Sequence, residues 1–121
     1  MIGYVTLGTN DPARAQAFYD ALLASIGASR IMELQNFILW GRSMEEPCLA
    51  STPPYDGQAA TAGNGTMIAL RMNSTDEVDA LYAKAMELGA ADEGAAGDRG
   101  DGFYAGYFRD PDGNKLCAFH A

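Results

Sequence analysis

The chain of 121 residues carries 16 acidic and 8 basic side chains, a net charge of −8, with 48% apolar and 20% charged residues. This length and composition predict one globular domain with its own core, and the acidic balance disfavours nucleic acid as a partner because no cluster of Lys or Arg offsets it. No apolar run approaches the roughly 20 residues of a membrane span, and the N-terminal residues do not resemble a signal peptide, so we expect a cytoplasmic protein that does not bind membranes.

The first part of the chain predicts a strand, a helix and three further strands. A β-rich run over residues 2–8 leads to Asp11-Pro12, where a carboxylate that caps free amides and a proline in the first turn mark a helix start. Apolar residues then recur at three-four spacing until Gly27, which supplies the left-handed residue that ends a helix. The three strands are expected over residues 29–33, 37–41 and 47–51.

A segment rich in prolines and glycines, residues 53–65, follows and predicts a linker. After it the pattern recurs: a strand over 67–72, then Ser74 and Glu77 as a capping box, with Gly89 closing the helix. Helix starts and stops at nearly the same offset in both halves indicate an internal repeat. We therefore divide the single domain into module one (1–52), the linker (53–65) and module two (66–121).

The last part of the chain predicts three strands around one sharp turn. Residues 90–102 are rich in Gly and Ala and predict one short, irregular strand. Residues 103–109 and 115–120 flank Asp110–Asn114, whose Pro and Gly suit a hairpin turn. Each half is then βαβββ, which predicts an α+β fold: two modules with curved mixed sheets, helices on the convex faces and a cavity on the concave side.

Two segments resemble those of a known family. The order Tyr-Val-Thr-Leu-Gly at 4–8, Asn-Asp-Pro at 10–12 and Ala-Phe-Tyr at 17–19 is similar to the opening of the vicinal oxygen chelate superfamily, the glyoxalase, bleomycin-resistance and extradiol-dioxygenase group. The stretch Phe-Arg-Asp-Pro-Asp-Gly-Asn-Lys-Leu at 108–116 is similar to its closing hairpin. The resemblance spans nearly the whole chain and implies this fold and a homodimer, which the open sheet edge of each module also favours.

The resemblance also implies where the metal-using members hold their ligands. These positions fall on Tyr4, Met67 and Cys117, with a fourth near Ala50, and together they offer no set of imidazole and carboxylate groups for a divalent ion. The only histidine, His120, is expected on the opposite face of its strand from Cys117. We therefore predict no metal and no cofactor, and we expect both cysteines to be free thiols.

Six residues are the candidates for a ligand-binding cavity against the concave sheet: Tyr4, Trp40, Met67, Arg71, Tyr107 and Cys117. Each has a structural alternative. Tyr4 is either an aromatic of the core or cavity wall or a hydrogen-bonding partner of the ligand, and Trp40 is either cavity wall or core. Strand aromatics such as Tyr107 are more often core, although a tyrosine at the matching distance before the turn contacts ligand in the fosfomycin-resistance members. Cys117 is either a nucleophile or, as we favour, a small buried residue.

Arg71, if it points inward, needs an anionic partner such as Glu33 or a bound carboxylate; a solvated position at the rim is the alternative. A cavity of this lining suits a planar or aromatic molecule with one acidic group, whereas the net charge favours a cationic guest; contact groups set specificity, so we follow the lining.

Four hypotheses of function remain. The one we adopt is metal-independent binding of a small molecule, as in the bleomycin-resistance members. The alternatives are a metal-dependent lyase, isomerase or dioxygenase of the glyoxalase type, an enzyme that uses Tyr, Arg and Cys without metal, and a dimer whose cavity is filled by its own side chains.

Overall fold

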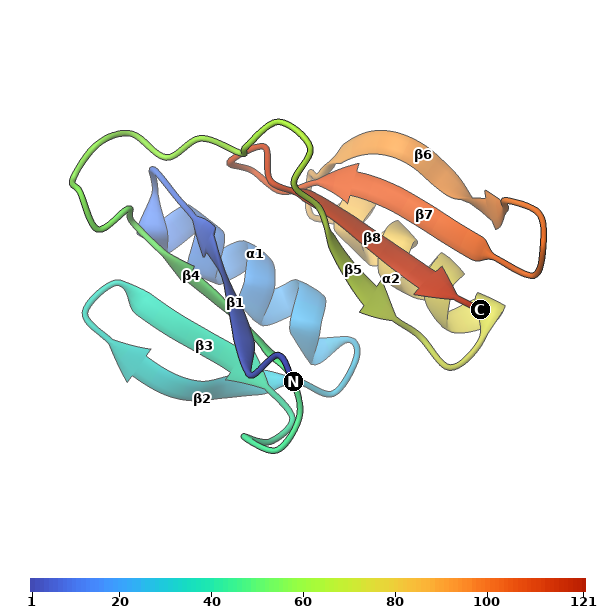
Figure 1. Ribbon diagram of the computed structural model, residues 1–121, viewed down its shortest axis with the longest axis horizontal. Coiled ribbons are helices and arrows are strands. Elements are labelled where there is room, and N and C mark those ends of the chain that lie inside the picture. Colours follow the sequence, from blue (N-terminus) through green and yellow to red (C-terminus); the bar gives the residue numbers. More distant parts are fainter.

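The computed structural model describes all residues, 1–121, as two helices and two four-stranded sheets (Figure 1). The elements in chain order are β1 (Tyr4–Gly8), α1 (Pro12–Ala24), β2 (Ser29–Leu34), β3 (Phe37–Gly41), β4 (Cys48–Thr52), β5 (Ile68–Arg71), α2 (Thr75–Glu87), β6 (Ala91–Asp98), β7 (Tyr104–Arg109) and β8 (Lys115–His120). The predicted α+β fold with two βαβββ modules is therefore confirmed. Neither helix is long and apolar enough to cross a membrane.

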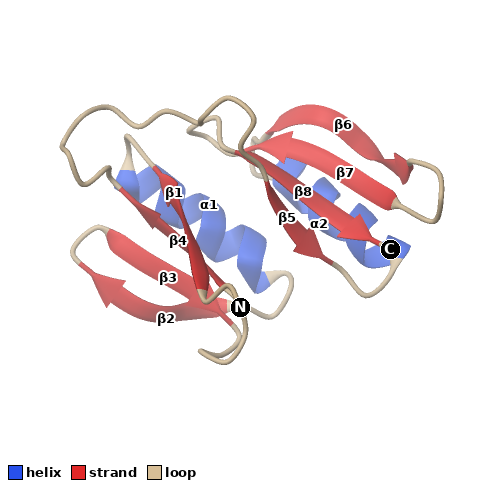
Figure 2. Cartoon of the chain, viewed as in Figure 1, coloured by secondary structure: helices blue, strands red, loops and turns tan.

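The two sheets repeat one topology. The strand order is β1-β4-β3-β2 in the first sheet and β5-β8-β7-β6 in the second, with β1–β4 and β5–β8 parallel and the other pairs antiparallel. Both helices lie behind the sheets, on the same side of the molecule (Figure 2). The edge strands β1 and β5 face each other across the junction of the modules without pairing, and β2 and β6 are open at the outer edges.

Side-chain caps begin both helices, as the sequence predicts. The carboxylate of Asp11 accepts a hydrogen bond from the amide of Arg14 at 3.1 Å, and the hydroxyl of Ser74 accepts one from the amide of Glu77 at 3.1 Å. The carboxylate of Glu77 returns to the amide of Asn73 at 2.8 Å, one residue before the position that a standard capping box uses. The cap of α2 therefore also holds the end of the connection from β5.

One core joins the two modules behind the sheets. Phe18 and Leu22 of α1, Leu81 of α2 and Phe108 of β7 belong to the same cluster of buried apolar residues. Burial of such side chains contributes about 1.5–3 kcal/mol each to folding. Because the helix layer is shared, the modules pack as one unit.

The turn Asp110–Asn114 fastens the second module to the first. Buried Asp110 accepts hydrogen bonds from the hydroxyl of Tyr19 in α1 at 2.5 Å and from the side-chain amide of Asn114 at 2.9 Å. That amide also donates to the carbonyl of Gly8 at the end of β1, at 2.9 Å. Burial, together with the charge of Asp110, raises the pKa of Tyr19 well above its usual value, so the hydroxyl keeps its proton and acts as the donor.

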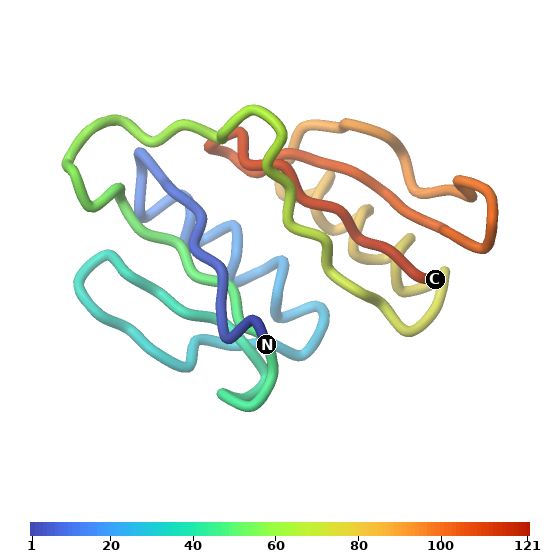
Figure 3. The backbone as a smooth tube through the Cα atoms, viewed as in Figure 1, coloured from blue at the N-terminus to red at the C-terminus, as the bar shows by residue number.

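Residues 53–67, which include the segment predicted as a linker (53–65), contain no helix or strand. In Figure 3 this segment runs along one edge of the molecule from β4 to β5. The side chain of Asn10 binds the middle of this segment: it accepts a hydrogen bond from the amide of Ala60 at 2.7 Å and donates one to the carbonyl of Ala60 at 3.2 Å. The linker is thus attached to the start of α1.

Candidate functional site

The second sheet has one face against α2 and one face free of helices. Phe108, Leu116 and Ala118 are fully buried in the core on the helix side. Strand side chains alternate between faces, so their neighbours point the other way. We call the helix-free side of β5, β7 and β8 the open face; its residues are Ala69, Arg71, Ala105, Tyr107, Arg109, Lys115, Cys117 and Phe119.

The register of β7 and β8 confirms which predicted residues share this face. Tyr107 lies directly opposite Cys117 in the antiparallel pair. Phe108 turns to the helices, as expected. His120 also lies on the helix side, where its Nδ1 is 3.1 Å from the carbonyl oxygen of Met72, so it is separated from Cys117 as predicted.

Basic side chains lie over aromatic rings on the open face. The guanidinium carbon of Arg71 is 4.9 Å from the ring centroid of Phe119, and Phe119 stacks on Phe103 with centroids 5.4 Å apart. The guanidinium of Arg99 and the ammonium of Lys115 each lie 5.5 Å from the ring centroid of Tyr107. Glu33 is not the partner of Arg71, because its carboxylate is bonded to Arg30.

Cys117 is fully buried beneath these groups. Burial raises the pKa of its thiol, while a hydrogen bond with Tyr107 and the charges of Arg99 and Lys115 act against that rise. Its Sγ also lies 3.6 Å from the carbonyl oxygen of Ala118, to which it can donate. A protonated, enclosed thiol is a poor nucleophile, which favours the interpretation of Cys117 as a small core residue.

The positions implied for a metal all lie on the helix-free side, yet their donors do not fit an ion. Tyr4 and Ala50 alternate with core residues of β1 and β4, and Met67 precedes β5 with 41% of its surface exposed. Tyr4 is 55% exposed and contacts the ring of Phe37 edge-on. No three His, Cys, Asp or Glu side chains come together anywhere in the chain. A phenol, a methyl group, a thioether and a protonated thiol cannot chelate a hard divalent ion.

Trp40 lies on the other side of its sheet from where we expected it. Its exposed fraction is 1%, its indole N–H donates to Asp20 of α1 at 2.8 Å, and its ring centroid is 5.5 Å from that of Tyr19. Hydrogen bonds from Arg30, and more weakly from Trp40, lower the pKa of Asp20 against the effect of burial. The expectation that Trp40 forms part of the concave sheet face is therefore wrong.

A crevice of about 500 Å³ separates the modules between β1 and β5. Its walls are mostly apolar and include Val5, Cys48, Met67 and Ala69, and it reaches the helix layer, where Trp40 borders it. Arg71 lies at its margin and over Phe119 at once, so the crevice opens onto the open face. Sequence patterns within each module give no sign of it, because it forms only when the two modules are placed side by side.

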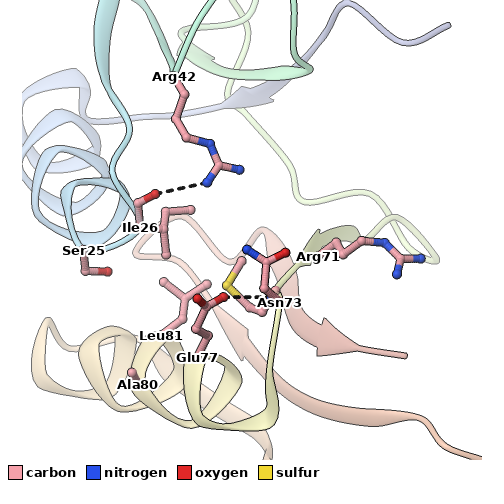
Figure 4. Close-up of a pocket in the computed structure, with 9 residues that line it drawn as sticks. Ser25, Ile26, Arg42, Arg71, Asn73, Glu77, Ala80 and Leu81 are labelled. Carbon is pink, nitrogen blue, oxygen red and sulfur yellow. Dashed lines mark hydrogen bonds between the residues drawn. The ribbon is translucent and has the colours of Figure 1, made fainter.

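A smaller pocket of about 270 Å³ lies between the end of α1 and the start of α2 (Figure 4). Arg42 donates to the carbonyl of Ile26 at 3.4 Å, and Glu77 accepts from Asn73, so these polar groups already have partners. The side chain of Arg71 points away from this pocket in Figure 4. The open face and its crevice are thus the better candidate site.

Sequence reasoning missed two basic residues of the site. Lys115 could have been found by alternation, since it stands two positions before Cys117 on the same strand. Arg99 lies in the turn after β6, where bulges between Asp92 and Gly97 leave no regular period to follow.

Comparison with known proteins gives one consistent result. A model of the glyoxalase/bleomycin resistance protein/dioxygenase superfamily matches residues 1–118. A crystal structure of a glyoxalase/bleomycin resistance protein from Albidiferax ferrireducens is 32% identical and covers 100% of this chain and 98% of its own, with a TM-score of 0.90. A glyoxalase-related enzyme from Fulvimarina pelagi shares the fold at 20% identity, with coverage of 100% and 88% and a TM-score of 0.79. A putative glyoxalase from Bacillus halodurans does so at 18%, with coverage of 100% and 96% and a TM-score of 0.80. No curated protein matches significantly.

Proposed function

The chain belongs to the glyoxalase/bleomycin resistance protein/dioxygenase superfamily, and we propose that it binds a small organic molecule on the open face and in the adjoining crevice without a chelated metal ion. One observation carries this proposal. Where the resemblance places metal ligands, the chain has Tyr4, Ala50, Met67 and Cys117, and beside them lie half-exposed aromatic and basic side chains that the core does not use. Such a mixture of apolar surface and a few polar groups is typical of ligand sites.

The alternative, a metal-dependent lyase, isomerase or dioxygenase, requires three or four converging hard donors, which these positions lack. Chemistry by Tyr107, Arg71 and Cys117 is also disfavoured, because the thiol is buried with its pKa raised and no base contacts it. A cavity filled by its own side chains is disfavoured by the crevice of about 500 Å³. Our proposal also places the protein in the cytoplasm, in keeping with its two free thiols.

The first prediction tests binding and metal independence together. We expect chelator-treated protein to bind members of a fragment library, with amide shifts in NMR spectra centred on β5, β7 and β8. Dialysis against Ni²⁺, Zn²⁺, Mn²⁺ or Fe²⁺ should leave only traces of bound metal by elemental analysis, because no donor set is available.

Two results would contradict this. A stoichiometric ion held with micromolar or tighter affinity would overturn the metal-free part. If no fragment shifts the open-face amides with or without metal, the binding part fails. Shifts confined to α1 and α2, on the opposite side of the molecule, would count against the site as well.

We further propose that the protein is a homodimer, and this is the second prediction. Each sheet has two open edges, and exposed apolar side chains lie beside them: Ile2 and Tyr4 near β1, and Met32 and Leu34 on β2. Open edges and apolar patches favour symmetric association. Sedimentation velocity should give the mass of two chains at micromolar concentration, and a single species of one chain at high micromolar concentration would refute the dimer.

A further inference from the structure

The ion pairs of the chain divide its basic side chains into two groups. Five of the eight Lys and Arg residues have a carboxylate oxygen within 4.0 Å; they are Arg14, Arg30, Arg42, Lys84 and Arg109. The other three, Arg71, Arg99 and Lys115, have no Asp or Glu oxygen within that distance. Because acidic side chains outnumber basic ones by 16 to 8, a basic group without an acidic partner is unexpected here.

These three unpaired cations are also the three that lie over aromatic rings of the open face. Contact with a ring contributes about 0.5–1 kcal/mol at an exposed site and leaves the hydrogen-bond donors of the cation free. Arg71 uses one donor for a terminal oxygen of Ala121, the last residue, at 3.4 Å, and Arg99 uses one for the carbonyl of Ala95 at 2.5 Å. The side-chain ammonium of Lys115 donates no hydrogen bond within the chain. Most donors of this group are therefore available to a ligand.

Two of the cations contact the same ring, Arg99 from the side of β6 and Lys115 from β8. Arg99 and Lys115 lie at equal distances from the ring of Tyr107, and both charges also act on the thiol of Cys117, the residue opposite Tyr107. The carboxylate of Glu93 is bonded to Arg109, and its charge also interacts with that of Lys115, so one acidic group stands against Arg109, Lys115 and Arg99 together. Basic groups thus outnumber acidic ones around Tyr107, on a molecule whose overall charge is negative.

We propose that the ligand is an organic anion with a flat apolar part, and that Arg99 and Lys115 bind its anionic group beside Tyr107. Arg71 then contributes at the junction with the crevice, where Met67 and Ala69 offer apolar surface for the flat part. This inference rests on the proposed function and narrows its ligand to one chemical class. The negative field of the whole chain repels anions at long range, so selectivity comes from these contacts, which are stronger than screened distant charges.

A set of three naphthalene compounds tests the proposal by calorimetric titration: 1-naphthoate, the neutral 1-naphthalenemethanol and the cationic 1-naphthylmethylamine. We expect 1-naphthoate to bind about tenfold tighter than the alcohol, since hydrogen bonds to charged groups are stronger than neutral ones. Arg99→Gln and Lys115→Gln should each weaken 1-naphthoate roughly fivefold to tenfold and leave the alcohol unchanged. Lys115→Arg, which keeps the charge, should retain most of the affinity.

The matched control is Lys84→Gln, which removes a basic residue of α2 that is paired with Glu87 and lines neither the open face nor the crevice. It changes the net charge by the same amount and should leave 1-naphthoate affinity unaltered. Equal binding of acid and alcohol on the open face would overturn the anion inference while the proposed function stands. An equal loss in Lys84→Gln and Arg99→Gln would also overturn it, since net charge alone would then explain the effect. If NMR shift mapping places none of the three compounds on the open face, the proposed function is overturned as well.

Discussion

Replacement of Asp110 by alanine is expected to lower the free energy of unfolding by about 3–5 kcal/mol, because it leaves several buried donors without an acceptor. The carboxylate accepts from the hydroxyl of Tyr19, from the side-chain amide of Asn114 and from the backbone amides of Asp112 and Asn114, at 2.5–2.9 Å. These donors come from both modules, so the loss should affect the junction and not one hairpin alone. Urea unfolding followed by circular dichroism measures the change.

Two further variants separate the contribution of Asp110 from a general effect of lost charge. Tyr19→Phe removes one of these hydrogen bonds and should cost less, about 1–2 kcal/mol. Asp56→Ala is the matched control, because Asp56 is exposed in the linker and accepts only from the amide of Gln58 at 2.9 Å, so its loss should stay within about 0.5 kcal/mol. If Asp110→Ala proves no more destabilising than Asp56→Ala, the turn does not fasten the modules.

The elements themselves could be predicted because their signals are local. A capping residue, a three-four spacing and a closing glycine mark each helix, and β3 falls on the predicted residues 37–41. The turn Asp110–Asn114 was also predicted, but only as a hairpin. Its side chains also bind α1 and β1, through contacts between residues about a hundred positions apart, such as Asn114 with Gly8. Local patterns carry no information on those contacts.

The candidate site was predictable where strands alternate between a buried and an exposed face. On β8 the helix-facing Leu116 and Ala118 alternate with Cys117 and Phe119, so the alternation of strand side chains placed Cys117 on the correct face. On β3 both faces are buried and apolar, and Leu39 and Trp40 are almost equally inaccessible to solvent. The alternation of side chains alone therefore could not assign Trp40 to one face. A hydrogen bond decides which face Trp40 occupies, because the carboxylate that accepts from its indole N–H lies on α1.

Replacement of Trp40 by alanine should therefore act on folding, with an expected loss of about 3–5 kcal/mol. The change removes a ring packed against Tyr19 and leaves a cavity beneath α1, and it deprives Asp20 of one of its donors. Tyr107→Ala, on the open face of the other sheet, removes a half-buried ring that contacts Arg99 and Lys115, so it should cost about 1 kcal/mol. Chemical denaturation of both variants under the same conditions gives the comparison.

The more conservative Trp40→Phe tests whether Trp40 also contributes to binding through the crevice that it borders. Phenylalanine keeps most of the ring volume but loses the N–H, while Asp20 retains its hydrogen bonds from Arg30 at 2.8 Å, so the fold should survive with a loss of about 1–2 kcal/mol. Because the indole is directed at α1, affinity for 1-naphthoate should stay within about twofold, a change of less than 0.5 kcal/mol. A tenfold loss of affinity in Trp40→Phe, with stability preserved, would show that the crevice admits ligand as far as the helix layer. The binding site would then extend from Tyr107 through the junction of the modules to Trp40.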